Sequence, residues 1–244
     1  TLTTTPTAKD VRKPALAYEN VPLGQESEED PPLPSLDKFH FAIICALPKE
    51  YDAVIQSVEY QWPTTIPFDP NDENIYTLAK MGGHKVVIAL QPKVGPGQSQ
   101  TITEALKRKF TKVILFLVVG ICGAVPIPQN PENVHSRIFL GDVVISKTIA
   151  QYLDQGQIKP GGVASGHIIM RSGEFRDMVS REQNILAFEM EGAGVQIGSS
   201  SCLIIKAACD YADSHKKKDF QEYAAGVAAS AAKAVLQTYP TDAE

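Results

Sequence analysis

The stretch FHFAIICA, at residues 39–46, is a nearly continuous run of apolar residues. A run without polar alternation is typical of a strand that is buried on both faces, as in a parallel sheet covered by helices. Directly after it, Pro48-Lys49-Glu50 begins a segment that we expect to be helical through Val58, with the proline in the first turn. A strand followed at once by a helix favours an α/β fold.

The same alternation continues along the rest of the chain. We expect Gly82-Gly83 to join strands at residues 74–79 and 85–90 as a hairpin-like turn. Further strands are expected at residues 112–119, 142–146, 162–164 and 203–207, and further helices at residues 99–110, 191–197 and 220–236. The pattern predicts a three-layer α/β/α sandwich around a mixed, largely parallel sheet.

The first part of the chain has a different composition. Residues 1–37 are rich in Thr, Pro, Glu and Asp. Such a segment buries little apolar surface, so we expect an extended arm or linker at residues 1–37. The remaining length is enough for one large domain with a full core, which we expect at residues 38–240.

Composition argues against several classes of function. The net charge of −5 gives no electrostatic footprint for nucleic acid, and no apolar stretch reaches the ~20 residues needed to span a membrane. The polar, Thr-rich start is unlike a signal peptide, so we expect a cytoplasmic protein, in the cytosol or nucleus. None of the four cysteines has metal-ligand spacing, which predicts buried free thiols and no metal site.

Two acidic segments near the C-terminus point to chemistry. They are AFEMEGA at residues 187–193 and CDYADSH at residues 209–215, the second following the apolar run at 202–205. A carboxylate beside hydrophobic sequence is costly unless it is paired or used. A Glu-x-Glu can serve only to stabilise a helix N-terminus, and an Asp after a strand can serve only as a helix cap, a role that suits Asp213 better than Asp210. Both segments together, in this order, favour a functional site.

Five stretches in order resemble the nucleoside phosphorylase and nucleosidase superfamily, over about residues 39–236. They lie at residues 43–50, 119–125, 140–146, 187–193 and 206–215. The last stretch is most similar to a fungal branch that often forms one domain of larger signalling proteins. The resemblance implies a nucleoside phosphorylase-like fold, a purine nucleoside or nucleotide substrate, no metal or organic cofactor, and a homodimer or higher homo-oligomer.

The resemblance also implies roles for individual residues. Asp210 protonates the leaving purine, and Glu191 holds the ribose 2′- and 3′-hydroxyls. Such an acid must be kept protonated, which burial and the like charge of Asp213 both favour. The other residues expected to bind substrate are Met190 and Phe188 beside the sugar or base, Phe220 as a cover, Ile169 and Met170 along the base, and Gly120, Cys122 and Gly123 in a Gly-rich turn.

Several basic residues are available for a charged substrate. Lys206 lies four residues before Asp210, and Arg171, Arg176 and the run Lys216-Lys217-Lys218 are candidates from loops. If some of them converge, they can hold the phosphates of a nucleotide. A run of lysines is more often a solvated face.

The nucleophile is expected to be water. In the family's phosphorylases an Arg and a Ser or Thr bind phosphate, but Val118 and Ile121 occupy these positions here. Residues 47–50 instead resemble the nucleosidase pattern, in which a Glu, here Glu50, activates water as general base. We expect hydrolysis of the N-ribosyl bond of a substrate such as adenosine, AMP or ATP. Phosphorolysis with phosphate as co-substrate is the first alternative, and a non-catalytic nucleoside-sensing module is the second.

One segment departs from the family. The family has several tens more residues between Ser146 and Ser165, where residues 147–164 stand here. Either the loop is deleted or its residues are absent from this sequence, and the abrupt stretch at residues 155–162 favours the second. Part of the pocket wall is therefore expected to differ from the family.

Overall fold

The computed structural model describes residues 31–63, 72–128, 137–146, 149–152, 162–199 and 201–240. The chain divides into two units, Thr1–Pro32 and Leu33–Glu244, and the described residues lie in the second apart from Pro31 and Pro32. The arm predicted at residues 1–37 therefore lies almost entirely outside the described residues, as does most of the short segment at 147–164. A 3₁₀ turn at Leu36–Lys38 precedes the first strand.

Four strands in the middle of the sheet run parallel. β1 (Phe41–Cys45) pairs with β4 (His84–Leu90) on one side and with β5 (Leu115–Ala124) on the other, and β5 pairs in turn with β10 (Cys202–Asp210). Every residue of β1 is buried. The apolar run at residues 39–46 thus forms a doubly covered strand, as its sequence predicts.

One end of the sheet is antiparallel. β3 (Ile75–Met81) and β4 form a hairpin, and the glycines between them have φ angles of 61° at Gly82 and 85° at Gly83. Glycine adopts these angles readily, so the predicted turn is confirmed. β2 (Tyr60–Trp62) adds a short antiparallel edge strand that the sequence pattern does not reveal.

The other end of the sheet mixes both directions. β6 (Val143–Ser146) pairs antiparallel with β10, and β9 (Ala187–Glu189) pairs antiparallel with the last residues of β5. β8 (Val163–Gly166) and β7 (Ile149–Tyr152) continue from β9 in parallel. Among the described residues the sheet has ten strands in the order β2-β3-β4-β1-β5-β9-β8-β7, with β10 and β6 branching from β5.

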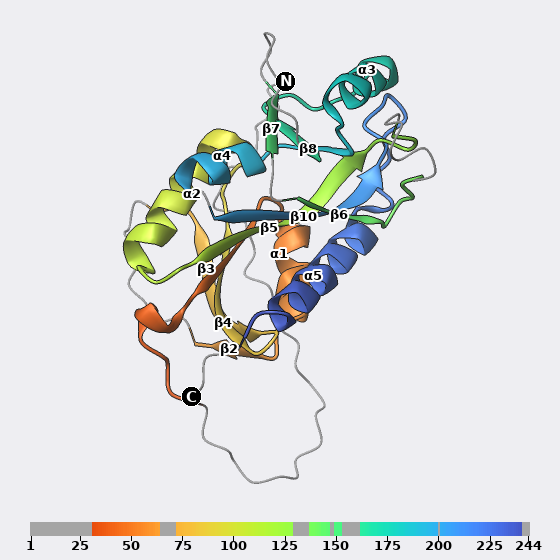
Figure 1. Ribbon diagram of the computed structural model, residues 1–244. Helices are drawn as coiled ribbons and strands as arrows, with labels where there is room; N and C mark the ends of the chain where they lie inside the picture. Colours follow the sequence, from red (N-terminus) through yellow and green to blue (C-terminus); the bar gives the residue numbers. More distant parts are fainter. Residues whose placement is uncertain are drawn as a thin grey trace, which may run out of the picture. The chain divides into compact units, whose positions relative to one another are not determined.

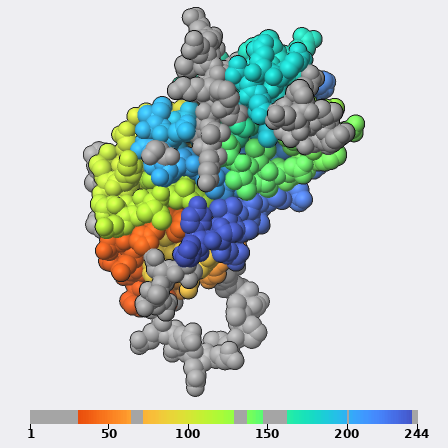
Figure 2. Space-filling view, in the orientation of Figure 1, coloured from red at the N-terminus to blue at the C-terminus, as the bar shows by residue number. Residues whose placement is uncertain are grey.

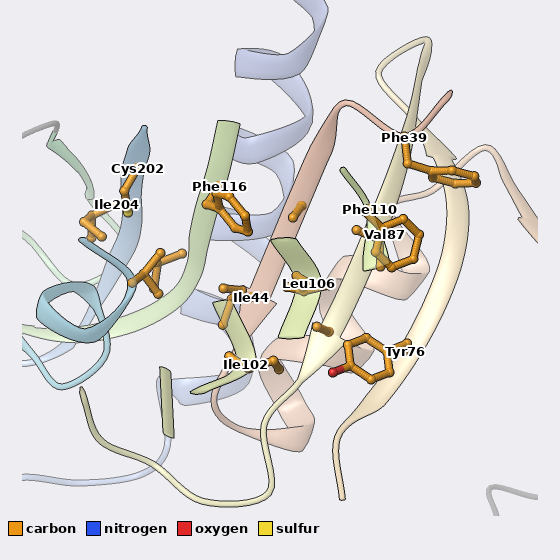
Figure 3. Close-up of a cluster of buried hydrophobic side chains, with 14 of the residues drawn as sticks. Phe39, Ile44, Tyr76, Val87, Ile102, Leu106, Phe110, Phe116, Cys202 and Ile204 are labelled. Carbon is orange, nitrogen blue, oxygen red and sulfur yellow. The ribbon is translucent and has the colours of Figure 1, made fainter. Parts of the chain in front are cut away.

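Helices cover both faces of this sheet (Figure 1). α2 (Pro96–Lys109) and α4 (Gly192–Gly198) lie on one face, where Ile102 and Leu106 pack among strand residues such as Ile44 (Figure 3). α2 is amphipathic and buries its apolar residues against the sheet.

The opposite face carries α1 (Pro48–Gln56) and α5 (Gln221–Gln237). α5 is dark blue in Figure 2. Its alanines Ala224, Ala228 and Ala232 are buried in one cluster with residues of the strands. Their four-residue spacing places them on one side of the helix, and their small side chains allow close packing. The predicted three-layer α/β/α sandwich is confirmed.

Some element boundaries differ from the predicted ones. β5 continues through Gly120 to Ala124 instead of ending at Val119, because β10 runs beside it with Lys206 opposite Gly120. α3 (Gly173–Gln183) was not predicted, although Ser172 caps it by accepting a hydrogen bond from the Phe175 N–H. The short strands β7 and β9 also lie outside the predicted set.

Candidate active site

A pocket of about 290 Å³ lies at the carboxyl ends of β1, β5 and β10. In open α/β sheets, ligands bind in the crevice outside these strand ends. Of the residues predicted to act or to bind substrate, the wall contains Glu50, Cys122, Gly123, Ile169, Met170, Phe188, Met190, Glu191 and Asp210. These residues come from segments far apart in the sequence, so the fold brings most of the predicted set together.

Glu50 lies in the first turn of α1 and is almost fully buried. Its Oε2 accepts hydrogen bonds from the Ala46 and Leu47 N–H groups, both at 2.9 Å, and its Oε1 accepts one from the Ile121 N–H at 2.7 Å. A carboxylate has about four acceptor positions. Main-chain donors fill three of them, which fixes the side chain and leaves one position on Oε1.

Gly120 makes room for Glu50 and does not line the pocket. A Cβ atom at this position on β5 would lie 1.9 Å from Glu50 Oε1. Only glycine allows the carboxylate to approach the strand so closely.

Lys206 lies on β10 with 1 % of its surface exposed, among three carboxylates. Its Nζ is 3.1 Å from Glu191 Oε2, 3.7 Å from Glu50 Oε1 and 3.9 Å from Glu189 Oε2. Burial by itself lowers the pKa of Lys206, but Glu50, Glu191 and Glu189 outweigh it and raise that pKa above its ordinary value. Lys206 is not part of the pocket wall, so it contacts the carboxylates from behind.

The two glutamates of Glu-Met-Glu have different environments. Glu189 caps α4 by accepting hydrogen bonds from the Glu191 N–H at 2.9 Å and the Gly192 N–H at 3.0 Å. Burial raises the pKa of Glu189, and Glu191 adds to this, while Lys206 opposes it. Glu191 accepts only the Lys206 bond, through Oε2, so its Oε1 has no partner within the described part of the chain.

Asp210 ends β10 and points its carboxylate into the pocket. Its Oδ1 accepts a hydrogen bond from the Ala212 N–H at 2.8 Å and lies 3.1 Å from Lys216 Nζ. Ala212 has a φ of 53°, a left-handed conformation that is uncommon outside glycine.

One expectation about this segment is wrong: Asp213 does not cap the last helix, because α5 begins at Gln221 after Phe220. Asp210 forms its ion pair with Lys216, whereas Asp213 lies 3.7 Å from Arg176. Asp210 and Asp213, on either side of the turn at Ala212, therefore have different cationic partners.

Gly123 and the thiols complete this end of the pocket. A Cβ at Gly123 would lie 2.8 Å from Ala212 Cβ and 2.9 Å from Asp210 Oδ1. Burial, with Asp210 nearby, raises the pKa of the Cys209 thiol to about 12, and burial also raises the pKa of Cys122. Both thiols are therefore neutral and unsuited to act as nucleophiles.

Other predicted residues lie outside the wall. Phe220 is 44 % exposed and precedes α5, and the neighbouring Gln221 lines the pocket in its place. Arg176 is buried, donates to the Tyr211 carbonyl at 2.5 Å and pairs with Asp177. Arg171 is exposed. In the described ranges, no arginine lines the pocket.

Sequence reasoning missed several wall residues as substrate contacts. They are Ala46, Leu47, Val94, Ile121, Ile168, Glu189, Cys209 and Gln221. Glu189, Leu47 and Ile121 lie within the quoted motifs, so the sequence could have indicated them as wall residues. Lys216, one of the basic residues that the sequence analysis considered for a charged substrate, also lies in the wall. Its contact with Asp210 forms across the turn at Ala212, which has no sequence signature here.

Metal and membrane features are absent from the described residues. No group of three or more His, Cys, Asp or Glu side chains there is arranged to hold a metal ion. Nor does that part of the chain contain a helix long and apolar enough to cross a membrane.

Residues 40–175, over half of the chain, match the model of the phosphorylase superfamily. The chain belongs to this superfamily. Its fold is similar to that of futalosine hydrolase from Helicobacter pylori, with a TM-score of 0.64 and 17 % identity over 83 % of this chain and 99 % of that one. It is also similar to 5′-methylthioadenosine/S-adenosylhomocysteine nucleosidase from S. pneumoniae, solved with a transition-state inhibitor. There the TM-score is 0.63 and the identity 20 %, over 81 % of this chain and 98 % of that one.

The chain is also similar to part of a longer curated protein. That relative is a nucleotide-binding leucine-rich repeat (NLR)-like protein of Hyaloscypha variabilis, 24 % identical over 322 residues. The match covers 93 % of this chain and 30 % of the relative, so the chain spans about a third of that protein's length.

Proposed function

We propose that this domain cleaves the N-ribosyl bond of a purine nucleoside or nucleotide, such as adenosine, AMP or ATP, with water as nucleophile. The observation that carries the proposal is the convergence of Glu50, Glu191 and Asp210 on one pocket at the strand ends. Cleavage needs a proton for the leaving base, a grip on the ribose and a positioned water, and these three carboxyl groups can supply them.

Asp210 is the proposed general acid. When the bond from C1′ to N9 breaks, its electron pair passes into the purine, and a proton from the Asp210 carboxyl neutralises the base at N7. The Ala212 N–H holds Oδ1 in place, so the acid is oriented before the substrate binds.

Glu191 is the proposed ribose ligand. Its Oε2 is held by Lys206, which leaves Oε1 to accept hydrogen bonds from the 2′- and 3′-hydroxyls. A buried carboxylate that loses such partners remains unpaired, so the site should discriminate strongly against a 2′,3′-dideoxy sugar.

Glu50 is the proposed general base. Its remaining acceptor position on Oε1 can take a proton from water while the hydroxide adds to C1′. Phosphate fits less well beside Glu50, because the carboxylates of Glu50, Glu189 and Glu191 line the pocket there and repel a phosphate ion. Hydrolysis is therefore proposed ahead of phosphorolysis.

The comparisons support this choice of chemistry. Both structures named above are of hydrolases or nucleosidases, and they suggest water as co-substrate here. The NLR-like relative is about three times as long as the match, which favours a domain that acts within a larger protein.

Base release from a panel of nucleosides and nucleotides tests the proposal. We predict that Asp210→Asn lowers the rate on the order of 10²–10⁴-fold, because the acid step is lost, while calorimetry still detects binding of the substrate. Asp219→Asn, at an exposed position, is the matched control and should keep the full rate. Near wild-type turnover by Asp210→Asn would remove Asp210 from the mechanism.

A further inference from the structure

Lys216 holds the residue proposed as the general acid. Its Nζ lies 3.1 Å from Asp210 Oδ1, and it lines the pocket. Its neighbours Lys217 and Lys218 are exposed, whereas the Lys216 side chain is 27 % exposed. Among the described residues, Lys216 is the only cation in the wall, since Lys206 lies behind the carboxylates. The lysine run thus contributes one side chain to the site.

The pair of Asp210 and Lys216 presents two groups side by side to a purine. Asp210 in its acid form donates to N7, and the atom next to N7 along that edge of the base is the substituent on C6. In guanine N7 and O6 are both acceptors, whereas in adenine N7 is an acceptor and the 6-amino group is a donor. Hypoxanthine carries the same 6-oxo group as guanine.

An ammonium group can only donate hydrogen bonds. Beside a 6-oxo group, Lys216 gains a hydrogen-bond acceptor. Beside a 6-amino group, it faces another donor and must either leave the site or remain unsatisfied. As Lys216 turns toward O6 it also moves off Asp210.

We propose that Lys216 reads the 6-position of the purine and makes this pocket selective for 6-oxopurines. The inference rests on the proposed function for the position of the base, and it places inosine and guanosine ahead of adenosine. Lys216 contributes specificity, while Asp210 transfers the proton to N7.

Binding of the free bases gives the first test. Calorimetry of hypoxanthine and adenine with the whole chain should show hypoxanthine binding on the order of 10–100-fold more tightly, as expected for one hydrogen bond from a charged donor. In Lys216→Gln the side-chain amide both donates and accepts, so the two affinities should become similar. Lys217→Gln is the matched control and should keep the wild-type ratio. Equal affinities in the wild type, no binding of either base, or an unchanged ratio in Lys216→Gln would overturn the inference.

Turnover separates this inference from the proposed function. We expect kcat/KM for inosine to exceed that for adenosine by a similar factor, and Lys216→Gln to raise the value for adenosine while lowering that for inosine. Equal kcat/KM values for both nucleosides would remove the selectivity and leave N-ribosyl cleavage standing. Selective binding of hypoxanthine without cleavage of any nucleoside would remove the proposed function and leave Lys216 as the reader of the base.

Discussion

Lys206 is a single buried cation that faces Glu50, Glu189 and Glu191 within 3.9 Å. Three carboxylates and one ammonium leave an excess of negative charge, and main-chain N–H groups on Glu50 and Glu189 provide the rest of the stabilisation. Removing one member of a buried ion pair is costly because the remaining charge is left without a partner. Lys206 should therefore matter for folding as well as for the proposed chemistry.

We predict that Lys206→Met lowers the free energy of unfolding by roughly 3–5 kcal/mol at pH 7. This loss in the free energy of unfolding should be smaller near pH 4.5 and larger at higher pH. The pKa of Glu189 is already raised in the folded state, so the folded chain binds more protons there than the unfolded chain, and stability falls as pH rises from 4.5. Urea denaturation at several pH values, with the exposed Lys217→Met as control, measures this. A loss of stability that does not change with pH would contradict this role of Lys206 among the three carboxylates.

Glu191 offers a second prediction at this scale. Glu191→Gln should weaken binding of a nucleoside far more than binding of its free base, by on the order of 10-fold or more, because hydrogen bonds from the ribose to a charged acceptor are lost. Calorimetry with the nucleoside and the base in parallel tests this. If both affinities fall equally, Glu191 is structural and does not contact the ribose.

At the scale of elements, β5 and α1 meet where Gly120 faces Glu50. The sequence predicts a strand and a Gly-rich turn there, and the structure instead continues the strand through the glycines. Periodicity cannot reveal this, since the reason is contact with side chains from other elements: Glu50 against Gly120, and Ala212 against Gly123. The glycines are required by tertiary packing and not by a turn.

We predict that Gly120→Ala displaces the Glu50 carboxylate and lowers hydrolysis by at least about 10-fold, since the added Cβ would lie 1.9 Å from Oε1. It should also destabilise the fold by about 1–3 kcal/mol through overpacking. Gly226→Ala is the matched control, because nothing lies within 4 Å of its Cβ position on α5, and it should stabilise the helix by roughly 0.5–1 kcal/mol. Thermal melts and rates of both variants check this; an active, stable Gly120→Ala would place Glu50 outside the mechanism.

Predictability also differs among elements. β1, the hairpin of β3 and β4, and α5 follow from long apolar runs, a Gly-Gly turn and an Ala-rich repeat, which are local signals. β2, β7 and β9 have few residues and form through pairing with neighbours. α3 carries a Ser172 cap that a closer reading of residues 172–175 could have found.

At the scale of the whole molecule, the order of strands and helices predicts the α/β/α sandwich, and the motifs predict which chain segments meet. The carboxyl ends of β1, β5 and β10 bring Glu50 and Asp210 to one pocket, as expected for parallel strands. The ion pair of Asp210 with Lys216 was not predicted, because it forms across a turn that contains a left-handed residue, Ala212, and has no sequence signature here.

The source of the oxygen added to the ribose tests the central claim most directly. The chain is incubated with inosine and adenosine in phosphate-free buffer containing ¹⁸O-labelled water, and the products are analysed by mass spectrometry, with a parallel sample containing phosphate. The account predicts free base and ribose carrying one ¹⁸O atom at C1′, at a rate that phosphate does not increase. Formation of ribose 1-phosphate, together with no reaction when phosphate is absent, would contradict it.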